Sequence, residues 1–245
     1  MLAHRPPQAS GSAPTLPKLQ PEQVAERVWY FRGAAGMASH ANAGFMSNAG
    51  FVVTDDGVVV FDALATPALA RAMVTAIADI TDQPIRRVVL SHYHADHIYG
   101  TQVFKALGAE IWARSEGRIY LRSEAAAERL AQRRRALAPW VDAHSRLVPA
   151  DRWLDFDDGE VQRFELGGVR FELISGGNSH APDDLMLSVP DQGVLFAGDL
   201  FFTARLPFVV DGNSRNWLRA LEHIQDRQAS VVVPGHGPAS VQVTD

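Results

Sequence analysis

Three histidines and one aspartate lie within the six residues 92–97, H-Y-H-A-D-H, directly after the apolar run R-R-V-V-L. Imidazole and carboxylate groups are ligands for divalent metals, whereas packing gives no reason to gather them in one loop. One ion could not comfortably use all four, but two ions about 3.5–4 Å apart could, as in hydrolytic metal sites. The cluster of His92, His94, Asp96 and His97 therefore predicts a dinuclear metal site with further ligands elsewhere.

Three residues in the second half of the chain are candidates for those ligands. His180 follows the apolar run F-E-L-I, Asp199 ends V-L-F-A-G-D, and His236 follows S-V-V-V-P-G. Each alone is more often an ordinary loop histidine, helix cap or turn former. Because all three lie at the ends of predicted strands, as the first cluster does, we interpret them together as ligands.

The first half predicts the strands that must position this cluster. The D-D-G at 55–57 separates two β-branched runs and predicts a hairpin of antiparallel strands. A helix is expected over 66–80, with Pro67 near its start, followed by a short buried strand at 87–90. The cluster then occupies the loop before a helix at 97–107, and a strand at 109–112 and a helix-rich segment at 115–144 come next.

The second half repeats this order without obvious sequence identity. Strands are expected at 152–156, 161–166, 169–174, 185–189 and 194–199, then a helix over 214–228 and a strand at 230–234. Its histidine loops again follow strand ends, where sites gather in α/β architectures.

The composition of the 245 residues excludes several classes of protein. A net charge of −5 with scattered arginines does not indicate a basic surface for binding nucleic acid. No apolar run is long enough to span a membrane. A small-molecule substrate is expected instead. The chain has no cysteine, so histidine and carboxylates must hold any metal. Residues 1–21 are expected to form a flexible leader without a secretory signal, which leaves a cytoplasmic or a periplasmic location open.

The motif H-Y-H-A-D-H, with the later His180, Asp199 and the P-G-H-G around His236, resembles the signature of metallo-β-lactamase-fold hydrolases. The resemblance extends over about residues 28–238. It implies an α+β fold, an αβ/βα four-layer sandwich of two mixed sheets flanked by helices, formed here by a domain at 22–245. Relatives usually continue with further helices after the last histidine, so the C-terminal helices are expected to be shortened.

The resemblance also implies the role of each candidate. His92, His94 and His180 would bind one metal and Asp96, His97 and His236 the other, with Asp199 bridging the two. Two zinc ions suit this donor set best, and iron or manganese also fits because a bridging carboxylate hardens the site. Asp62, at the end of V-V-V-F-D, would orient a ligand histidine.

The implied activity is hydrolysis of an ester, thioester, lactone or lactam by a hydroxide that bridges the two metals. Asp96 or Asp199 would transfer the proton. Tyr93, Tyr99 and His144 are candidate substrate contacts, although aromatic residues beside a loop are more often packing residues.

Among family members, the sequence around the motif looks most like metallohydrolases of the sulfur-oxidation and quinoprotein-relay type. Asp199 argues against the β-lactamase subclasses that carry cysteine at that position. Two alternatives stay open: a mononuclear iron dioxygenase acting on a persulfide, for which His97 and His236 would be dispensable, and a non-catalytic accessory protein of sulfur or quinoprotein metabolism. The sequence leaves the oligomeric state undetermined.

Overall fold

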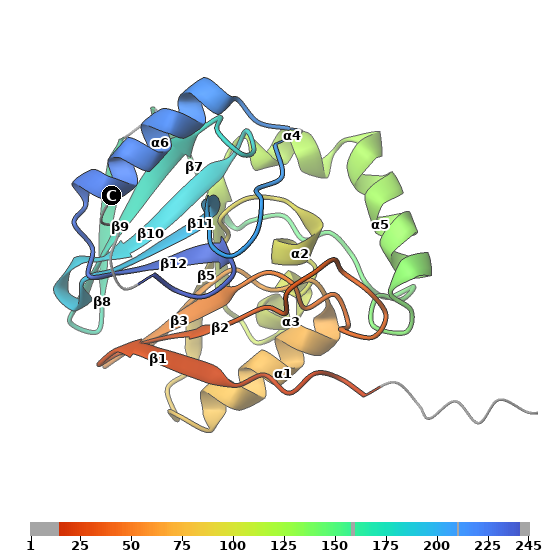
Figure 1. Ribbon diagram of the computed structural model, residues 1–245. Helices are drawn as coiled ribbons and strands as arrows, with labels where there is room; N and C mark the ends of the chain where they lie inside the picture. Colours follow the sequence, from red (N-terminus) through yellow and green to blue (C-terminus); the bar gives the residue numbers. More distant parts are fainter. Residues whose placement is uncertain (1–14, 158–159, 210, 241–245) are drawn as a thin grey trace, which may run out of the picture.

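Two β-sheets pack face to face in the computed structural model, which describes residues 15–157, 160–209 and 211–240 (Figure 1). The first sheet contains β1 (Pro21–Ala25), β2 (Val28–Phe31), β3 (Ala49–Thr54), β4 (Gly57–Phe61), β5 (Ile85–Val89), β6 (Glu110–Arg114) and β7 (Arg152–Leu154), in that order. The second has the order β12-β11-β10-β9-β8, formed by β8 (Val161–Leu166), β9 (Val169–Gly177), β10 (Asp184–Val189), β11 (Val194–Phe202) and β12 (Val231–His236).

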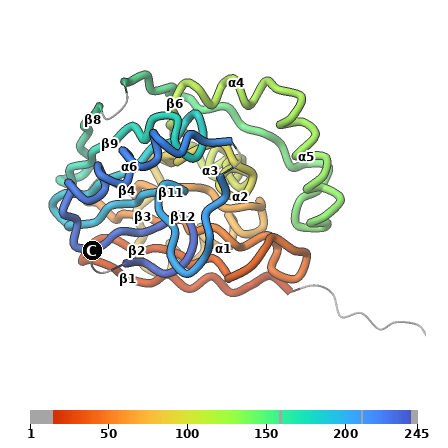
Figure 2. Tube along the Cα trace, turned by 45° about the horizontal axis from the view of Figure 1, so that its top comes forward, coloured from red at the N-terminus to blue at the C-terminus, as the bar shows by residue number. Residues whose placement is uncertain are grey.

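Helices cover the outer face of each sheet, which gives four layers (Figures 1 and 2). Helices α1 (Pro67–Ala78) and α3 (Thr101–Ala106) lie on the first sheet, and α6 (Ser214–Asp226) lies on the second. The other helical elements are α2 (Ala95–Ile98), α4 (Gly117–Leu121), α5 (Glu124–Ala136) and the 3-10 turn η1 (Pro190–Gln192). One buried cluster packs α1 and α3 on the first sheet, a second lies between the sheets, and a third packs α6 on the second sheet. The expected four-layer α+β sandwich is confirmed.

Local interactions explain the predicted hairpin and the starts of helices α1 and α6. β3 and β4 pair antiparallel around Asp55 and Asp56. Thr66 caps α1 by accepting a hydrogen bond from the Leu69 amide, and Asn213 caps α6 in the same way. None of the helices in the described ranges is long and apolar enough to cross a membrane.

Both halves contain the expected succession of elements. In each, a run of antiparallel strands leads through a helix to a strand that pairs parallel to the preceding one: β4 with β5, and β11 with β12. The first sheet then continues with β6 and β7, which also pair parallel. The carboxyl ends of parallel neighbours lie at the same edge of a sheet. Both halves therefore bring their histidine-bearing ends to one edge of the sandwich.

The helix-rich segment expected at 115–144 is confirmed and contains α4 and α5. Two expectations about elements need correction. The helix expected at 97–107 is two short helices, α2 and α3, which break at Gly100, where a Cβ would lie 1.9 Å from the Ala63 carbonyl oxygen. β11 does not end at Asp199 but continues to Phe202, after a shift in register at Gly198, whose φ is 55°.

The expected leader lies largely outside the described residues, since the description begins at residue 15. Leu19 is buried in the core of the first sheet, and β1 begins at Pro21. The leader and its boundary with the domain stay predictions.

The side chain of Asn48 ties the two sheets together just before β3. Its amide donates to the carbonyl oxygens of Pro234 and Gly237 at 2.8 Å, and its oxygen accepts from the Gly33 amide. Next to it, Gly50 leaves room for the Phe196 ring of the opposite sheet, which stacks on Phe61.

Gly50→Ala tests this close approach of the sheets. An added Cβ would lie 2.1 Å from Phe196 Cε1, so we expect the free energy of unfolding to fall by about 2 kcal/mol. Urea unfolding in the presence of a chelator measures this without a contribution from bound metal. Ala127→Ser, at an exposed position of α5, should stay within about 0.5 kcal/mol of the parent. A Gly50→Ala protein as stable as this control would contradict the packing.

Candidate metal centre

Asp62 and Ser91 lie at the base of the site, where the parallel strands β4 and β5 end next to each other. Asp62 accepts hydrogen bonds from the Ser91 amide at 2.7 Å and the Ser91 hydroxyl at 2.8 Å. The φ of Asp62 is 65°, a left-handed conformation that aspartate and asparagine adopt more readily than most residues. This arrangement holds the backbone directly before His92.

His94, Asp96 and His97 lie at the start of α2 rather than in the predicted loop. His94 precedes the helix and its carbonyl accepts from the His97 amide at 3.0 Å. The Ser47 hydroxyl donates to the Asp96 carbonyl at 2.6 Å, which fixes the turn to the segment before β3. Asp62 accepts from His97 Nδ1 at 2.8 Å, so the expected orientation of a histidine by Asp62 is confirmed.

The second half supplies three side chains from separate positions. His180 lies in the loop after β9, and Asp184 shapes that loop by accepting from three consecutive backbone amides, those of residues 179–181. Asp199 lies inside β11. His236 is the last residue of β12, and its Nδ1 donates to the Met46 carbonyl at 2.7 Å.

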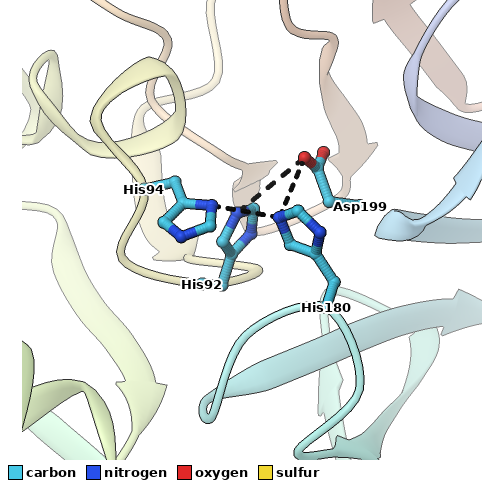
Figure 3. Close-up of side chains that lie close together, drawn as sticks. All are labelled: His92, His94, His180 and Asp199. Atoms are coloured by element: carbon cyan, nitrogen blue, oxygen red, sulfur yellow. Dashed lines mark hydrogen bonds and ion pairs between the residues drawn. The ribbon is translucent and has the colours of Figure 1, made fainter. Parts of the chain in front are cut away.

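The first of two donor clusters comprises His92, His94, His180 and Asp199, whose ligating atoms all lie within 4.8 Å of one another (Figure 3). His94 Nδ1 is 3.0 Å from His180 Nε2. Asp199 Oδ2 is 3.3 Å from His180 Nε2 and 4.0 Å from His92 Nε2. Four side chains from three separate parts of the sequence thus point into one small space.

The second cluster comprises Asp96, His97 and His236, with the same spacing of ligating atoms. His236 Nε2 is 3.4 Å from Asp96 Oδ2 and 3.3 Å from Asp199 Oδ2. His97 Nε2 is 3.2 Å from Asp199 Oδ1. The Asp199 carboxylate therefore lies between the two clusters and contacts both. All seven predicted site residues come together.

Burial keeps the imidazoles of the first cluster neutral. Burial, with the neighbouring His97 and His94 rings, lowers the pKa of His92 well below its ordinary value. Burial also lowers the pKa of His180 to about 4, against the opposing charge of Asp199. A neutral imidazole keeps a ring nitrogen lone pair for a metal.

In the second cluster, carboxylates and histidines shift each other's pKa. Burial alone would raise the pKa of Asp199, but the His236 and His97 rings outweigh it and hold that pKa well below its ordinary value. Burial alone would likewise lower the pKa of His97, yet Asp199, Asp62 and Asp96 together raise it well above its usual range. Positive charge therefore stabilises the buried carboxylates of the site, and protons supply that charge when no metal is bound.

The donor atoms fit metal ions. Among the described residues, His92 Nε2, His97 Nε2 and Asp199 Oδ1 are buried and have no hydrogen-bond partner. His180 Nδ1 donates to the Phe208 carbonyl at 2.9 Å, which leaves a lone pair on Nε2, facing His94 Nδ1. Buried polar atoms without partners are costly, and converging lone pairs repel unless a cation lies between them.

None of the three candidate substrate contacts belongs to either donor cluster. Tyr93 is buried, and its hydroxyl donates to the Val148 carbonyl. Tyr99 is buried in the core of the first sheet. His144 is exposed and belongs to neither cluster. The two tyrosines are packing residues, as the commoner interpretation of aromatic residues beside a loop suggested.

Sequence reasoning missed three groups that support the site. Asp184 is a buried carboxylate whose only signal is the D-D four residues after His180. Asp211 Oδ2 lies 3.4 Å from His94 Nε2, the ring nitrogen that faces away from the cluster. Phe208 acts through its backbone carbonyl. No residue type identifies a backbone acceptor, so the sequence carries no signal for it.

Comparison with known proteins identifies relatives with this fold. The family model described as the metallo-beta-lactamase superfamily matches residues 42–236. The metallo-beta-lactamase type 2 of Bacillus cereus is 24% identical over 226 residues, which cover 88% of this chain and 75% of that protein. A linear primary-alkylsulfatase of a Pseudomonas species is 23% identical over 218 residues, 74% of this chain but only 40% of that protein.

Solved structures of metallo-beta-lactamases also share this fold. A metallo-beta-lactamase from Pontibacter korlensis superposes with a TM-score of 0.71 at 23% identity, covering 91% of this chain and 94% of that one. The metallo-beta-lactamase FIM-1 from Pseudomonas aeruginosa, in a mono-zinc form, gives 0.69 at 21% identity and covers 92% of each chain. The named relatives are thus β-lactamases and an alkylsulfatase, and the expected kinship with sulfur-oxidation and quinoprotein-relay metallohydrolases finds no support among them.

Asp62→Asn tests whether the Asp62 carboxylate orients the ring of His97. Asparagine tolerates the same backbone conformation but removes the charge that orients the ring, so we expect zinc affinity of the second cluster to fall by about 10- to 100-fold. Competition with a chromophoric chelator measures both binding steps. The exposed Asp82→Asn is the control. Unchanged affinity in Asp62→Asn would show that Asp62 does not position His97.

Proposed function

This chain belongs to the metallo-beta-lactamase superfamily, and on that premise we propose that it is a dinuclear zinc hydrolase that cleaves an ester, thioester, lactone or lactam. The family makes it a metal-dependent hydrolase. The observation that supports two ions is the position of Asp199, whose two carboxylate oxygens contact donors of both clusters. A single ion would leave the donors of one cluster unused.

Each cluster would hold one ion, and Asp199 would serve both. The residues proposed as ligands are His92, His94 and His180 for the first ion, and Asp96, His97 and His236 for the second. A set of imidazoles and carboxylates without thiolate suits zinc, and it also suits iron and manganese. Zinc is favoured because the similar β-lactamase FIM-1 has been solved in a mono-zinc form.

Zinc, when bound, supplies a Lewis acid for the scissile carbonyl and lowers the pKa of water towards about 7. The chain keeps Asp199 ionised, which preserves the negative charge that two dications need. Asp96 is the more exposed of the two proposed catalytic carboxylates, with 15% of its side chain accessible against 6% for Asp199. We assign to Asp96 the transfer of the proton between the site and solvent.

The iron dioxygenase is the second candidate, and the two hypotheses differ in their need for the second cluster. A mononuclear site would use donors of the first cluster only. The second cluster is nevertheless as tightly assembled, and two parts of the fold hold it through Asp62 and the Met46 carbonyl. This construction supports the dinuclear hydrolase. The non-catalytic accessory role loses its support because the chain is a metal-dependent hydrolase.

Metal content and hydrolysis test the proposal together. We expect close to two zinc ions per chain by elemental analysis, and hydrolysis of at least one member of a panel of esters, thioesters, lactones and β-lactams. Alkyl sulfates belong in the panel because an alkylsulfatase is among the relatives. Chelation should abolish activity and added zinc should restore it. One metal per chain, or activity indifferent to chelator, would contradict the proposal.

His236→Ala distinguishes the two candidates. Loss of a ligand of the second ion should lower kcat/KM for hydrolysis by on the order of a hundredfold or more. His144→Ala is the matched control, because His144 is exposed and lies outside both clusters. Oxygen consumption with glutathione persulfide, retained in His236→Ala, would instead support the dioxygenase.

A further inference from the structure

Residues 178–183 connect β9 to β10 and carry His180, the ligand that the second half contributes to the first cluster alone (Figure 3). We call these residues the His180 loop. His92 and His94 come from the other half of the chain, and His94 Nδ1 lies 3.0 Å from His180 Nε2. The geometry of the first cluster therefore depends on how the His180 loop is fastened to the segment that carries those two ligands.

Arg114, the last residue of β6, holds both ends of the His180 loop. Its Nη1 donates to the carbonyls of Gly177 and Asp184 at 3.2 and 3.3 Å, and these two residues directly precede and follow the loop. Its Nη2 donates to Glu116 Oε1 at 2.7 Å. Arg114 is buried and belongs to the first sheet, whereas the loop belongs to the second. Because a buried charge is costly unless it is paired and hydrogen-bonded, these contacts keep Arg114 and the loop ends in one arrangement.

Asp183, the last residue of the His180 loop, fastens it to the first half of the site. Its Oδ2 accepts at 3.0 Å from the amide of Tyr93, which lies between two ligands of the first cluster. Close by, the Leu185 amide donates to the Ser91 carbonyl at 2.8 Å. Asp183 is buried, and the start of α4 covers it, since a Cβ on Gly117 would lie 2.9 Å from its Oδ2. One side chain and one backbone amide thus join the two ligand-bearing segments.

We propose that Arg114 and Asp183 are positioning residues of the first cluster, which hold the His180 loop where one ion contacts His180 together with His92 and His94. This role rests on the proposed dinuclear function, because it concerns the first of the two ions. Within the described ranges, none of the side-chain hydrogen bonds of Arg114 and Asp183 reaches a residue of the second cluster. Groups that orient ligands affect metal affinity strongly. Loss of either side chain should therefore weaken binding of the first ion and spare the second.

Two backgrounds with one complete cluster each separate the two ions. His236→Ala leaves the first cluster complete, and His92→Ala leaves the second. In the His236→Ala background, Asp183→Ala should lower zinc affinity by about 10- to 100-fold, because the loop loses its hydrogen bond to the Tyr93 amide. In the His92→Ala background, the same change should leave zinc affinity within about threefold. Competition with a chromophoric chelator measures each affinity.

Conservative variants show which property of each side chain matters. Burial raises the pKa of Asp183 to about 7 against the charge of Arg114, so a neutral acceptor is compatible with its surroundings. Asp183→Asn keeps an oxygen for the Tyr93 amide and should bind zinc within about threefold of the background. Arg114→Lys keeps the charge but loses the planar fork that reaches both loop ends and Glu116. It should lower zinc affinity by about tenfold, in the His236→Ala background alone.

Thr54→Ala is the matched control for the loss of a buried hydrogen bond. Thr54 is buried and donates to the Gly57 carbonyl at 2.7 Å in the β3–β4 hairpin, at the opposite end of β4 from Asp62. This variant should lower stability towards urea, measured in the presence of a chelator, and leave zinc affinity unchanged in both backgrounds. Arg114→Lys keeps the test decisive if Asp183→Ala does not fold.

Unchanged zinc affinity in Asp183→Ala and Arg114→Lys, or equal losses in the two backgrounds, would overturn the positioning role. So would a loss in Asp183→Asn as large as that in Asp183→Ala, because asparagine retains the acceptor. Losses confined to the first cluster, in a protein that hydrolyses none of the panel substrates, would reject the proposed function and leave this role standing. Hydrolysis of a panel substrate with unchanged affinity in the variants would reject this role alone.

Discussion

Five imidazoles and two carboxylates converge at an edge between two sheets, and this convergence is favourable only if positive charge lies among them. His92 and His97 are fully buried, and their Nε2 atoms, which lack a hydrogen-bond partner among the described residues, point towards Asp199. Such an arrangement has no stabilising role in a core, where polar atoms are normally paired. Only positive charge makes it favourable, and the fold is arranged to place that charge between two halves of the chain.

The parallel strand pairs explain how the halves meet this constraint. β4 and β5 bring Asp62 beside Ser91, and β11 and β12 bring the Asp199 strand beside His236. Asn48 then ties the two edges to each other. The outer ring nitrogens are fixed in turn by Asp62 and by the carbonyls of Met46 and Phe208. Each half alone presents an incomplete set of donors, so the site is complete only where the two halves pack against each other.

The sequence predicted most of this because residue types carry the signal. The positions of histidine and aspartate identified all seven residues of the two donor clusters, and β-branched runs with D-D-G identified the hairpin. The break at Gly100 could not be predicted, because there the His97 carbonyl accepts from the distant Ala63 amide and the Gly100 amide donates to the Leu64 carbonyl. The extension of β11 past Asp199 and the approach of Arg205 to His236 likewise depend on tertiary pairing with β12. Tertiary contacts, rather than local patterns, therefore determine these three features.

Anomalous diffraction at the zinc edge shows whether two ions share Asp199. We expect two anomalous peaks about 3.5–4 Å apart, one among His92, His94 and His180 and the other among Asp96, His97 and His236. Asp199 should contact both, with ligand distances of about 2.0–2.2 Å. One peak in a zinc-saturated crystal, or two peaks without a shared Asp199, would rule out a dinuclear site of this kind.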